Sequence, residues 1–317
     1  MSGPDSSLKL LQALNDRDKT TVSECTKNRS VKKWIDKRVD VKQIKNSNIS
    51  FASHVKDITC LGFASRNSDT RTVHQLVRAG ADVTATDSSG RTPLHWACES
   101  DIQVKQKVEY LLSCDASLLG ARDNSNSTPL NTAALSGNDA VVSVFIQHGA
   151  SVNEQGEFDR TALHGACNYG HVACINELMR HGADVEARDS ERGATPLQLA
   201  SLFNRPQCVK VLLDKYRALI NATNAFGVTA LHQAAYAGNL DVVKLLTSYS
   251  QCDVNAKDDA GKTSADCARD KGHMDVADYL ASISSVASVA ALLPSKQSVD
   301  IVFFFKFLLQ CIEVKEK

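Results

Sequence analysis

The sequence has no charge excess, no long uninterrupted apolar run and no closely spaced cysteine pair. Its 36 Lys and Arg balance 36 Asp and Glu, which argues against a protein that coats nucleic acid, so we expect no nucleic-acid partner. None of the ten cysteines lies in a Cys-x-x-Cys pair, and the opening MSGPDSSLKLLQ lacks the basic start and apolar stretch of a secretory signal. Unpaired thiols without a leader predict a reducing compartment, either the cytoplasm or the nucleus.

Basic residues are concentrated near the N-terminus. Residues 1–58 contain 12 Lys and Arg against 7 Asp and Glu, whereas the remainder contains 24 against 29. Most of the excess lies in Lys27–Lys45, where a nuclear-import signal or a patch for an acidic partner is one interpretation. A solvated surface is the preferred one, because Asp36 and Asp40 interrupt the cluster. The pattern leaves open whether residues 31–56 form a helix or a loop.

The C-terminal end is apolar but short. Residues 283–293 place apolar side chains at helical spacing and stop at Pro294, which predicts an extension of the preceding helix. The stretch VDIVFFFKFLLQCIEV, residues 299–314, follows after a linker. Asp300 and Lys306 interrupt it, and a spanning helix needs about 20 apolar residues, so we expect no membrane span. Packing on the rest of the chain and binding of a partner remain open for this tail.

A motif of the form Thr-x-Leu-x-x-Ala recurs along most of the chain. Successive copies are spaced by 33, 36, 33, 34, 34 and 34 residues. The two outermost copies are degenerate, and the full set starts at Thr59, Thr92, Thr128, Thr161, Thr195, Thr229 and Thr263. A second signal follows the motif, as in VRAGADVTATD and MRHGADVEARD. A fixed period of this length predicts a repeat protein, in which neighbouring units stack to bury their apolar faces.

The motif itself predicts the start of a helix. Thr92 can accept a hydrogen bond from a free N–H group of the first turn, and Pro93 suits the first helical position, where its missing N–H costs nothing. Leu94 and Ala97 then share one face. Apolar residues at helical spacing later in each unit predict a second helix, and a glycine such as Gly149 permits its left-handed ending.

The TPLH starts, GH turns and GADV endings resemble those of the ankyrin-repeat family over about residues 55–282. The resemblance implies an all-α solenoid of stacked helix–turn–helix units with β-hairpin fingers, and we expect a monomer. We divide the chain into an N-terminal capping half-repeat (1–30), a basic insert (31–56), a solenoid of about seven repeats whose last one caps the stack (57–282), and a helix extension with a Phe-rich tail (283–317).

Two His–Cys pairs raise the question of a zinc site. His95 and Cys98 share a helical face, as do His164 and Cys167, and zinc prefers these ligand types. However, most other repeats place non-ligand residues in the same slots, and the two pairs would lie about 20 Å apart in a stack that advances about 10 Å per layer. We therefore expect structural roles, with the histidines linking helices and fingers. We expect no metal, no cofactor and no catalytic site.

In ankyrin proteins, partners usually bind along the finger tips and the exposed side of the inner helices. Transferring these positions repeat by repeat predicts a concave binding face, which consists of Arg91, Glu99, Leu135, Glu157, Phe158, Arg160, Tyr169, Glu191, Arg192, Leu202, Phe203, Phe226, Val228 and Tyr236. Five aromatics among them fall in consecutive units, which is unusual for a solvated surface and typical of interface hot spots. The alternative is that these rings fold back onto neighbouring fingers.

We therefore predict a non-catalytic adaptor or inhibitor that binds one or more proteins. Two alternatives remain. The chain could recruit substrates to a larger complex such as a ubiquitin ligase, although residues 283–317 contain no recognisable recruitment box. It could also be a membrane-associated scaffold that uses the C-terminal tail.

Overall fold

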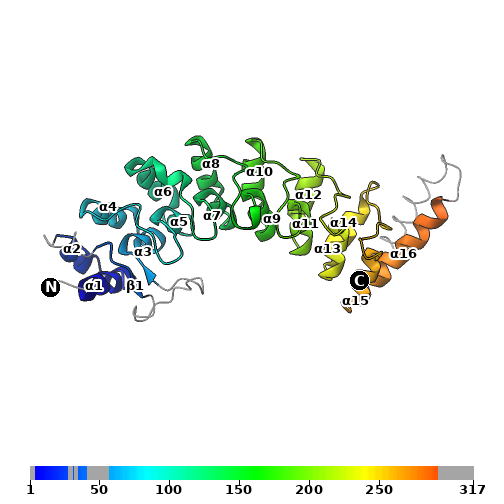
Figure 1. Cartoon of the computed structure of the whole chain (residues 1–317), viewed down its shortest axis with the longest axis horizontal. Coiled ribbons are helices and arrows are strands. Elements are labelled where there is room, and N and C mark those ends of the chain that lie inside the picture. The colour runs from blue at the N-terminus through cyan, green and yellow to red at the C-terminus, as the bar shows by residue number, and fades with distance from the viewer. Residues whose placement is uncertain (1–3, 28–30, 32–34, 41–56, 292–317) are drawn as a thin grey trace, which may run out of the picture. The chain divides into compact units, whose positions relative to one another are not determined.

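The chain folds into successive pairs of helices (Figure 1). They belong to two compact units. The computed structural model describes residues 4–27, 31, 35–40 and 57–291. Unit 1 comprises residues 1–166 and 173–183, and unit 2 comprises residues 167–172 and 184–317. The Phe-rich tail and most of the basic insert lie outside the described residues.

Unit 1 contains the first helix pairs. Its elements are α1 (Pro4–Asn15), α2 (Lys19–Lys27), β1 (Val39–Asp40), β2 (Asp57–Ile58), α3 (Cys60–Asn67), α4 (Thr70–Arg78), α5 (Pro93–Cys98), α6 (Val104–Cys114), the 3-10 helix η3 (Ala116–Gly120), α7 (Pro129–Leu135), α8 (Asp139–Gln147) and the 3-10 helix η4 (Glu157–Asp159), followed by most of α9 (Ala162–Tyr169) and α10 (Val172–Arg180). The predicted half-repeat at the N-terminus is thus a complete helix pair, in which α1 packs on α3 and α2 on α4.

Unit 2 contains the remaining pairs. Its helices are α11 (Pro196–Leu202), α12 (Pro206–Asp214), α13 (Ala230–Tyr236), α14 (Leu240–Ser248), α15 (Ser264–Asp270) and α16 (Met274–Ala291). The last helix runs on to Ala291, which confirms the predicted extension beyond residue 283.

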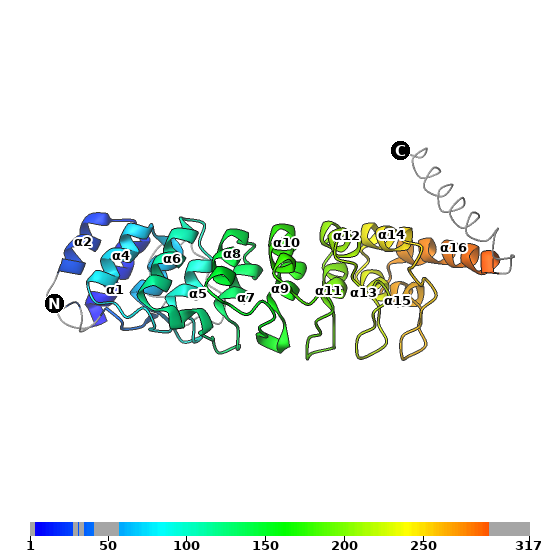
Figure 2. The same ribbon diagram turned by 90° about the horizontal axis from the view of Figure 1, so that it is seen from above.

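Within each unit the helices form two layers (Figure 2). In unit 1, α3 packs beside α5 and α5 beside α7 in the inner layer, while α4, α6 and α8 follow one another in the outer layer. In unit 2, α11, α13 and α15 form the inner layer and α12, α14 and α16 the outer one. The motif's Leu and Ala lie in the core: Leu94, Ala97 and Leu163 are fully buried. Stacking therefore buries the apolar faces, and the predicted all-α solenoid is confirmed.

The inner helices begin as the motif predicts. The hydroxyl oxygens of Thr128, Thr195 and Thr229 accept the backbone N–H of the residue three positions on, at 3.3–3.4 Å. Proline occupies the first turn of α5, α7 and α11. Each of these features satisfies or removes an N–H group that would otherwise lack a partner at the helix start.

The fingers are tight turns organised around one acidic or amide side chain, and not regular β-hairpins. In the finger before α5, Oδ1 of Asp87 accepts the backbone N–H groups of Ser89 and Arg91 at 2.8 and 2.9 Å. The same arrangement recurs at Asp123, Asn224 and Asp258. Asp189 accepts the N–H groups of Arg192 and Ala194 instead, three and five residues on. Among the described residues, regular strand pairing is limited to β1 with β2 and the bridge between Lys257 and Thr263. Asp and Asn favour this geometry because their side chains bond backbone N–H groups two residues on.

A buried lysine caps the C-terminal end of the inner helix α3 in unit 1. Lys107 of α6 is fully buried, and its Nζ donates to the carbonyls of Ser65 (2.5 Å) and Ser68 (3.1 Å) and to Oγ of Ser100 (2.5 Å). These carbonyls lie at the C-terminal end of α3, where a cation is favourable. Burial lowers the pKa of Lys107 to about 8.

Candidate protein-binding face

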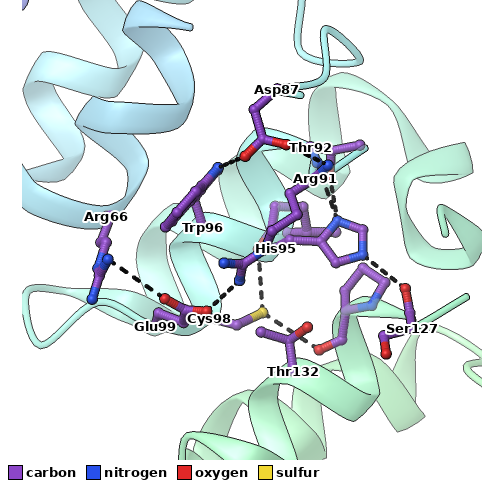
Figure 3. Close-up of polar contacts among 12 residues, drawn as sticks. Arg66, Asp87, Arg91, Thr92, His95, Trp96, Cys98, Glu99, Ser127 and Thr132 are labelled. Carbon is purple, nitrogen blue, oxygen red and sulfur yellow. Dashed lines mark hydrogen bonds and ion pairs between the residues drawn. The ribbon is translucent and has the colours of Figure 1, made fainter. Parts of the chain in front are cut away.

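Trp96 of α5 lies at the centre of a polar network in unit 1 (Figure 3). Its Nε1–H donates to Oδ2 of Asp87 at 3.0 Å, and the guanidinium of Arg91 lies 4.1 Å from the indole centroid. The guanidinium of Arg66 is 5.4 Å from the same ring, and both arginines pair with Glu99. The indole is fully buried, so this network satisfies its N–H and covers its ring face. Trp96 is therefore a buried structural residue of unit 1.

Arg91 was predicted to belong to the exposed binding face, and the structure contradicts its exposure. Its side chain is only 6 % exposed because it lies over Trp96 and pairs with Glu99. Arg91 is therefore part of the fold of unit 1. Glu99 is half-buried and holds the two arginines of this network.

His95 links its helix to the next finger, as predicted. Its Nδ1 accepts the backbone N–H of Thr92 at 3.2 Å, and Nε2 contacts the carbonyl of Ser127 at 3.1 Å. Because Nδ1 accepts, the proton of the neutral ring lies on Nε2, which donates to Ser127. Burial lowers the pKa of His95 to about 4. His232 repeats this arrangement with Thr229 and the carbonyl of Lys262.

The cysteines of the two His–Cys pairs are core residues. Cys98 is fully buried, and its Sγ donates to the carbonyls of Leu94 at 3.2 Å and Pro129 at 3.5 Å. Cys167 is also fully buried, and burial raises the pKa of both thiols. Within the described ranges, no three His, Cys, Asp or Glu side chains are grouped so that they could hold a metal ion.

Unit 1 contributes one unusual finger to the predicted face. Gly156 replaces the acidic side chain that organises the other fingers, and η4 forms at the tip. Phe158 has φ 55° and Asp159 φ 55°, a left-handed conformation that is uncommon for such residues. The Phe158 side chain is 49 % exposed, with the Arg160 guanidinium 5.5 Å from its ring centroid. Glu157 and Leu135 are exposed and Arg160 is half-buried.

Unit 2 contributes the aromatic residues that were predicted to be exposed. Four rings are about half accessible, namely Tyr169 (53 %), Phe203 (45 %), Phe226 (55 %) and Tyr236 (47 %). Leu202 and Val228 are half-buried beside them in sequence, and Glu191 and Arg192 are exposed at a finger tip. Among the described residues, Phe203 and Phe226 stack on no other ring and lie under no cation, and about half of each side chain stays accessible to solvent.

Sequence reasoning missed two cations on unit 2. Arg205 follows the left-handed Asn204 at the turn between α11 and α12, and its Nε donates to the carbonyl of Asn168 at 2.9 Å. Nζ of Lys271, at the end of α15, lies 4.5 Å from the ring centroid of Tyr236. The sequence could have predicted that both cations lie next to the predicted face, because each one follows an exposed position at the end of the inner helix of its repeat.

A small pocket lies elsewhere in unit 1. Its volume is about 170 Å³, and its lining includes Leu14 and Val22 on the apolar side and the Lys19–Asp69 ion pair, with an N–O distance of 3.1 Å, on the polar side. Ligand pockets for small molecules usually enclose about 300–1,000 Å³. This pocket is therefore a weaker candidate than the aromatic surface of unit 2.

Comparison with known families identifies the class of protein. The sequence matches the family described as "Ankyrin repeats (3 copies)" over residues 61–156, 152–224 and 216–289. The chain belongs to the ankyrin-repeat family, whose repeats are general protein–protein interaction modules. None of the helices in the described segments is long and apolar enough to cross a membrane.

Several curated proteins share part of this region. The human Neurogenic locus notch homolog protein 1 is 33 % identical over 142 residues, which are 45 % of this chain and 5 % of that protein. The human SH3 and multiple ankyrin repeat domains protein 2 is 31 % identical over 151 residues, 47 % of this chain and 8 % of that protein. The Ankyrin repeat protein nuc-2 of Neurospora crassa is 27 % identical over 164 residues, 52 % of this chain and 15 % of that protein. The chain thus spans a small part of each relative.

Proposed function

We propose that this chain is a non-catalytic adaptor or inhibitor that binds a partner protein mainly through the finger tips and inner-helix ends of unit 2. One observation supports this most strongly. Of the eight large apolar side chains that are exposed in the described residues, six were predicted from the repeat register to face a partner, namely Leu135, Phe158, Tyr169, Phe203, Phe226 and Tyr236. Exposed aromatics of this kind are the residues that dominate interface energies.

The surface is also pre-organised. The fingers of unit 2 are joined by backbone hydrogen bonds, from Ala225 N–H to the Arg192 carbonyl at 2.9 Å and from Asp259 N–H to the Phe226 carbonyl at 3.1 Å. Phe226 therefore lies on a finger whose backbone is fixed from both sides. A partner that binds it does not have to order this loop, which lowers the entropic cost of association.

The buried ionisable groups support a structural rather than a catalytic role. His95 uses both ring nitrogens to join its helix to the next finger, and the thiol of Cys98 is buried and protonated. We also propose a cytoplasmic or nuclear location, which the free thiols of the nine described cysteines support.

Comparative capture tests the proposal. The full-length chain, a Phe203→Ala/Phe226→Ala variant and a Leu219→Ala variant are immobilised in equal amounts and exposed to the same cell extract. Leu219 is a matched control because it is a 63 % exposed apolar residue of unit 2 outside the predicted face. We expect at least one protein to be lost from the double variant and retained by Leu219→Ala. An identical set of captured proteins for all three baits would contradict the proposal.

A further inference from the structure

The turns between inner and outer helices of unit 2 form a continuous row. Arg205 reaches back to the Asn168 carbonyl, and Nδ2 of Asn239 donates to the carbonyls of Ser201 and Leu202, both at 2.9 Å. At the next step the ring of His273 lies so close to Gly238 that a Cβ there would come within 2.6 Å of it. Each turn therefore contacts the preceding one, and the side chains at these turns share one surface.

This surface, here termed the turn row, combines aromatic rings with cations. It consists of Tyr169, His171, Phe203, Arg205, Tyr236 and Lys271. Tyr169 and His171 stack with centroids 6.3 Å apart, and Lys271 lies over Tyr236. Within the described residues, neither Arg205 nor Lys271 pairs with a carboxylate. In the part of the chain that the structure describes, Arg205 makes one side-chain hydrogen bond, through Nε, so both Nη groups remain available for a planar carboxylate.

Acidic groups do not balance these charges within the row. Asp270, the acidic residue beside Lys271, is paired with Lys262 of the neighbouring finger at 2.5 Å. Rings and unpaired cations on one surface are complementary to a ligand that offers carboxylates and apolar groups together.

We infer that the turn row binds an acidic, extended peptide segment of a partner protein whose apolar residues insert beside Phe203 and Tyr236. This inference rests on the proposed function and specifies its partner. Adjacent packed helices are about 8–10 Å apart, so the rings of successive repeats recur at about that distance. A polyproline II segment advances about 3.1 Å per residue with three residues per turn, so every third side chain recurs at about 9 Å on the same side. Carboxylates at the intervening positions reach Arg205 and Lys271.

Fluorescence anisotropy with synthetic peptides tests this inference on the full-length chain. Three labelled peptides of about 12 residues are compared. The first has leucine at every third position and acidic residues between, the second has leucine at the same positions and lysines between, and the third has serine in place of leucine and acidic residues between. We expect the acidic leucine peptide to bind at least about tenfold more tightly than either other peptide, and to weaken between about 50 and 300 mM salt.

Charge-removal variants assign the binding to the row. We expect Arg205→Gln/Lys271→Gln to weaken the acidic leucine peptide about tenfold and to flatten its salt dependence. Lys210→Gln/Lys257→Gln removes the same charge from exposed positions elsewhere in unit 2 and should change little. Lys271→Gln alone is the milder variant and should keep the fold, because Lys271 is exposed and its ammonium lies over the Tyr236 ring without a carboxylate partner among the described residues.

Three outcomes would overturn the inference. The first two are equal binding of the basic peptide and no binding of the acidic leucine peptide. The third is a dimer in sedimentation that Phe203→Ala dissociates, because the turn row would then bind a second copy of the chain. If the peptides fail while capture still depends on Phe203 and Phe226, the proposed function stands and only the acidic partner is excluded.

Discussion

At the ends of the inner helices, unit 1 carries mainly charged and small polar residues, whereas unit 2 carries three rings and two aliphatic side chains before its last repeat. The corresponding positions hold Arg66, Asn67, Glu99, Ser100, Leu135 and Ser136 in unit 1, and Asn168, Tyr169, Leu202, Phe203, Tyr236, Ala237, Asp270 and Lys271 in unit 2. In unit 1, Arg66 and Glu99 pair with each other and, with Arg91, enclose Trp96. In unit 2, Phe203 is 45 % exposed and makes no ring contact among the described residues.

The same repeat positions thus serve two purposes. A charged side chain that pairs within its own chain is already satisfied, and a partner gains little by displacing it. An exposed ring loses water-accessible apolar surface only when something covers it, which favours association. Substitutions at these positions should therefore change mainly the stability in unit 1 and mainly the binding of a partner in unit 2.

The largest expected effect is on the stability of unit 1. Trp96→Ala removes a fully buried indole and leaves a cavity, so we expect it to lower the free energy of unfolding by about 3–5 kcal/mol. Urea denaturation monitored by circular dichroism measures this change. Trp96→Phe keeps much of the ring but leaves Asp87 without its indole donor, and should cost about 1–3 kcal/mol. A loss below about 1 kcal/mol for Trp96→Ala would show that the indole is not a core residue.

The next effect concerns pH. The pKa of His95 falls from an ordinary 6.5 to about 4 in the folded chain because burial disfavours the charged ring. The folded state binds this proton less readily than the unfolded state. The free energy of unfolding is therefore unaffected by the titration of His95 above pH 6.5 and decreases as the pH falls from 6.5 toward 4. The loss amounts to up to about 3 kcal/mol at roughly 1.4 kcal/mol per pKa unit.

His95→Gln isolates this contribution. Gln198 occupies the same slot in unit 2, where Oε1 accepts the Thr195 N–H at 3.1 Å and Nε2 donates to the Val228 carbonyl at 2.9 Å. Glutamine can therefore make both hydrogen bonds of His95 without titrating. We expect thermal melts at pH 7 to be similar for both proteins and the variant to lose less stability between pH 6.5 and 4. Parallel pH profiles would show that His95 does not titrate in this range.

The third effect belongs to unit 2 and to binding. Phe203→Ala/Phe226→Ala should weaken the affinity for a captured partner at least tenfold, about 1.4 kcal/mol, because exposed aromatics dominate interface energies. The melting temperature should move by no more than a few degrees, since both rings are about half exposed. Titration calorimetry beside thermal melts measures both, with Leu219→Ala as the control. Unchanged affinity would place the interface elsewhere, whereas collapse of the fold would make these rings core residues.

Most of what the sequence predicted correctly, namely the helix starts and the exposed aromatics, followed from the position of each residue in the repeat. Helix starts follow from Thr and Pro, whose hydrogen bonding and backbone restrictions act locally, and the exposure of Phe203 and Phe226 follows from their place in the repeat. The predicted exposure of Arg91 was wrong because its side chain is covered through contacts with Trp96, five residues later, and with Glu99. The position of a residue in the repeat does not predict such contacts. Lys107 was missed for a similar reason: lysine is rarely buried, and its partners are carbonyls at the end of another helix.

The smallest expected effect is that of metal removal, which tests whether the His95–Cys98 pair in the core of unit 1 is structural. Zinc binding would require a thiolate at Cys98 and a free lone pair on His95. Cys98 is instead a buried thiol that donates to two carbonyls, and both nitrogens of His95 are engaged. A structural zinc contributes about 10 kcal/mol or more in small zinc domains, so its removal could not pass unnoticed. We expect EDTA to move the melting temperature by less than about 1 °C, since a chelator changes stability only through a metal bound to the folded state. A clear decrease, accompanied by about one zinc per chain in elemental analysis and abolished by Cys98→Ala, would make the His95–Cys98 pair a ligand set and give this part of unit 1 a metal-binding role.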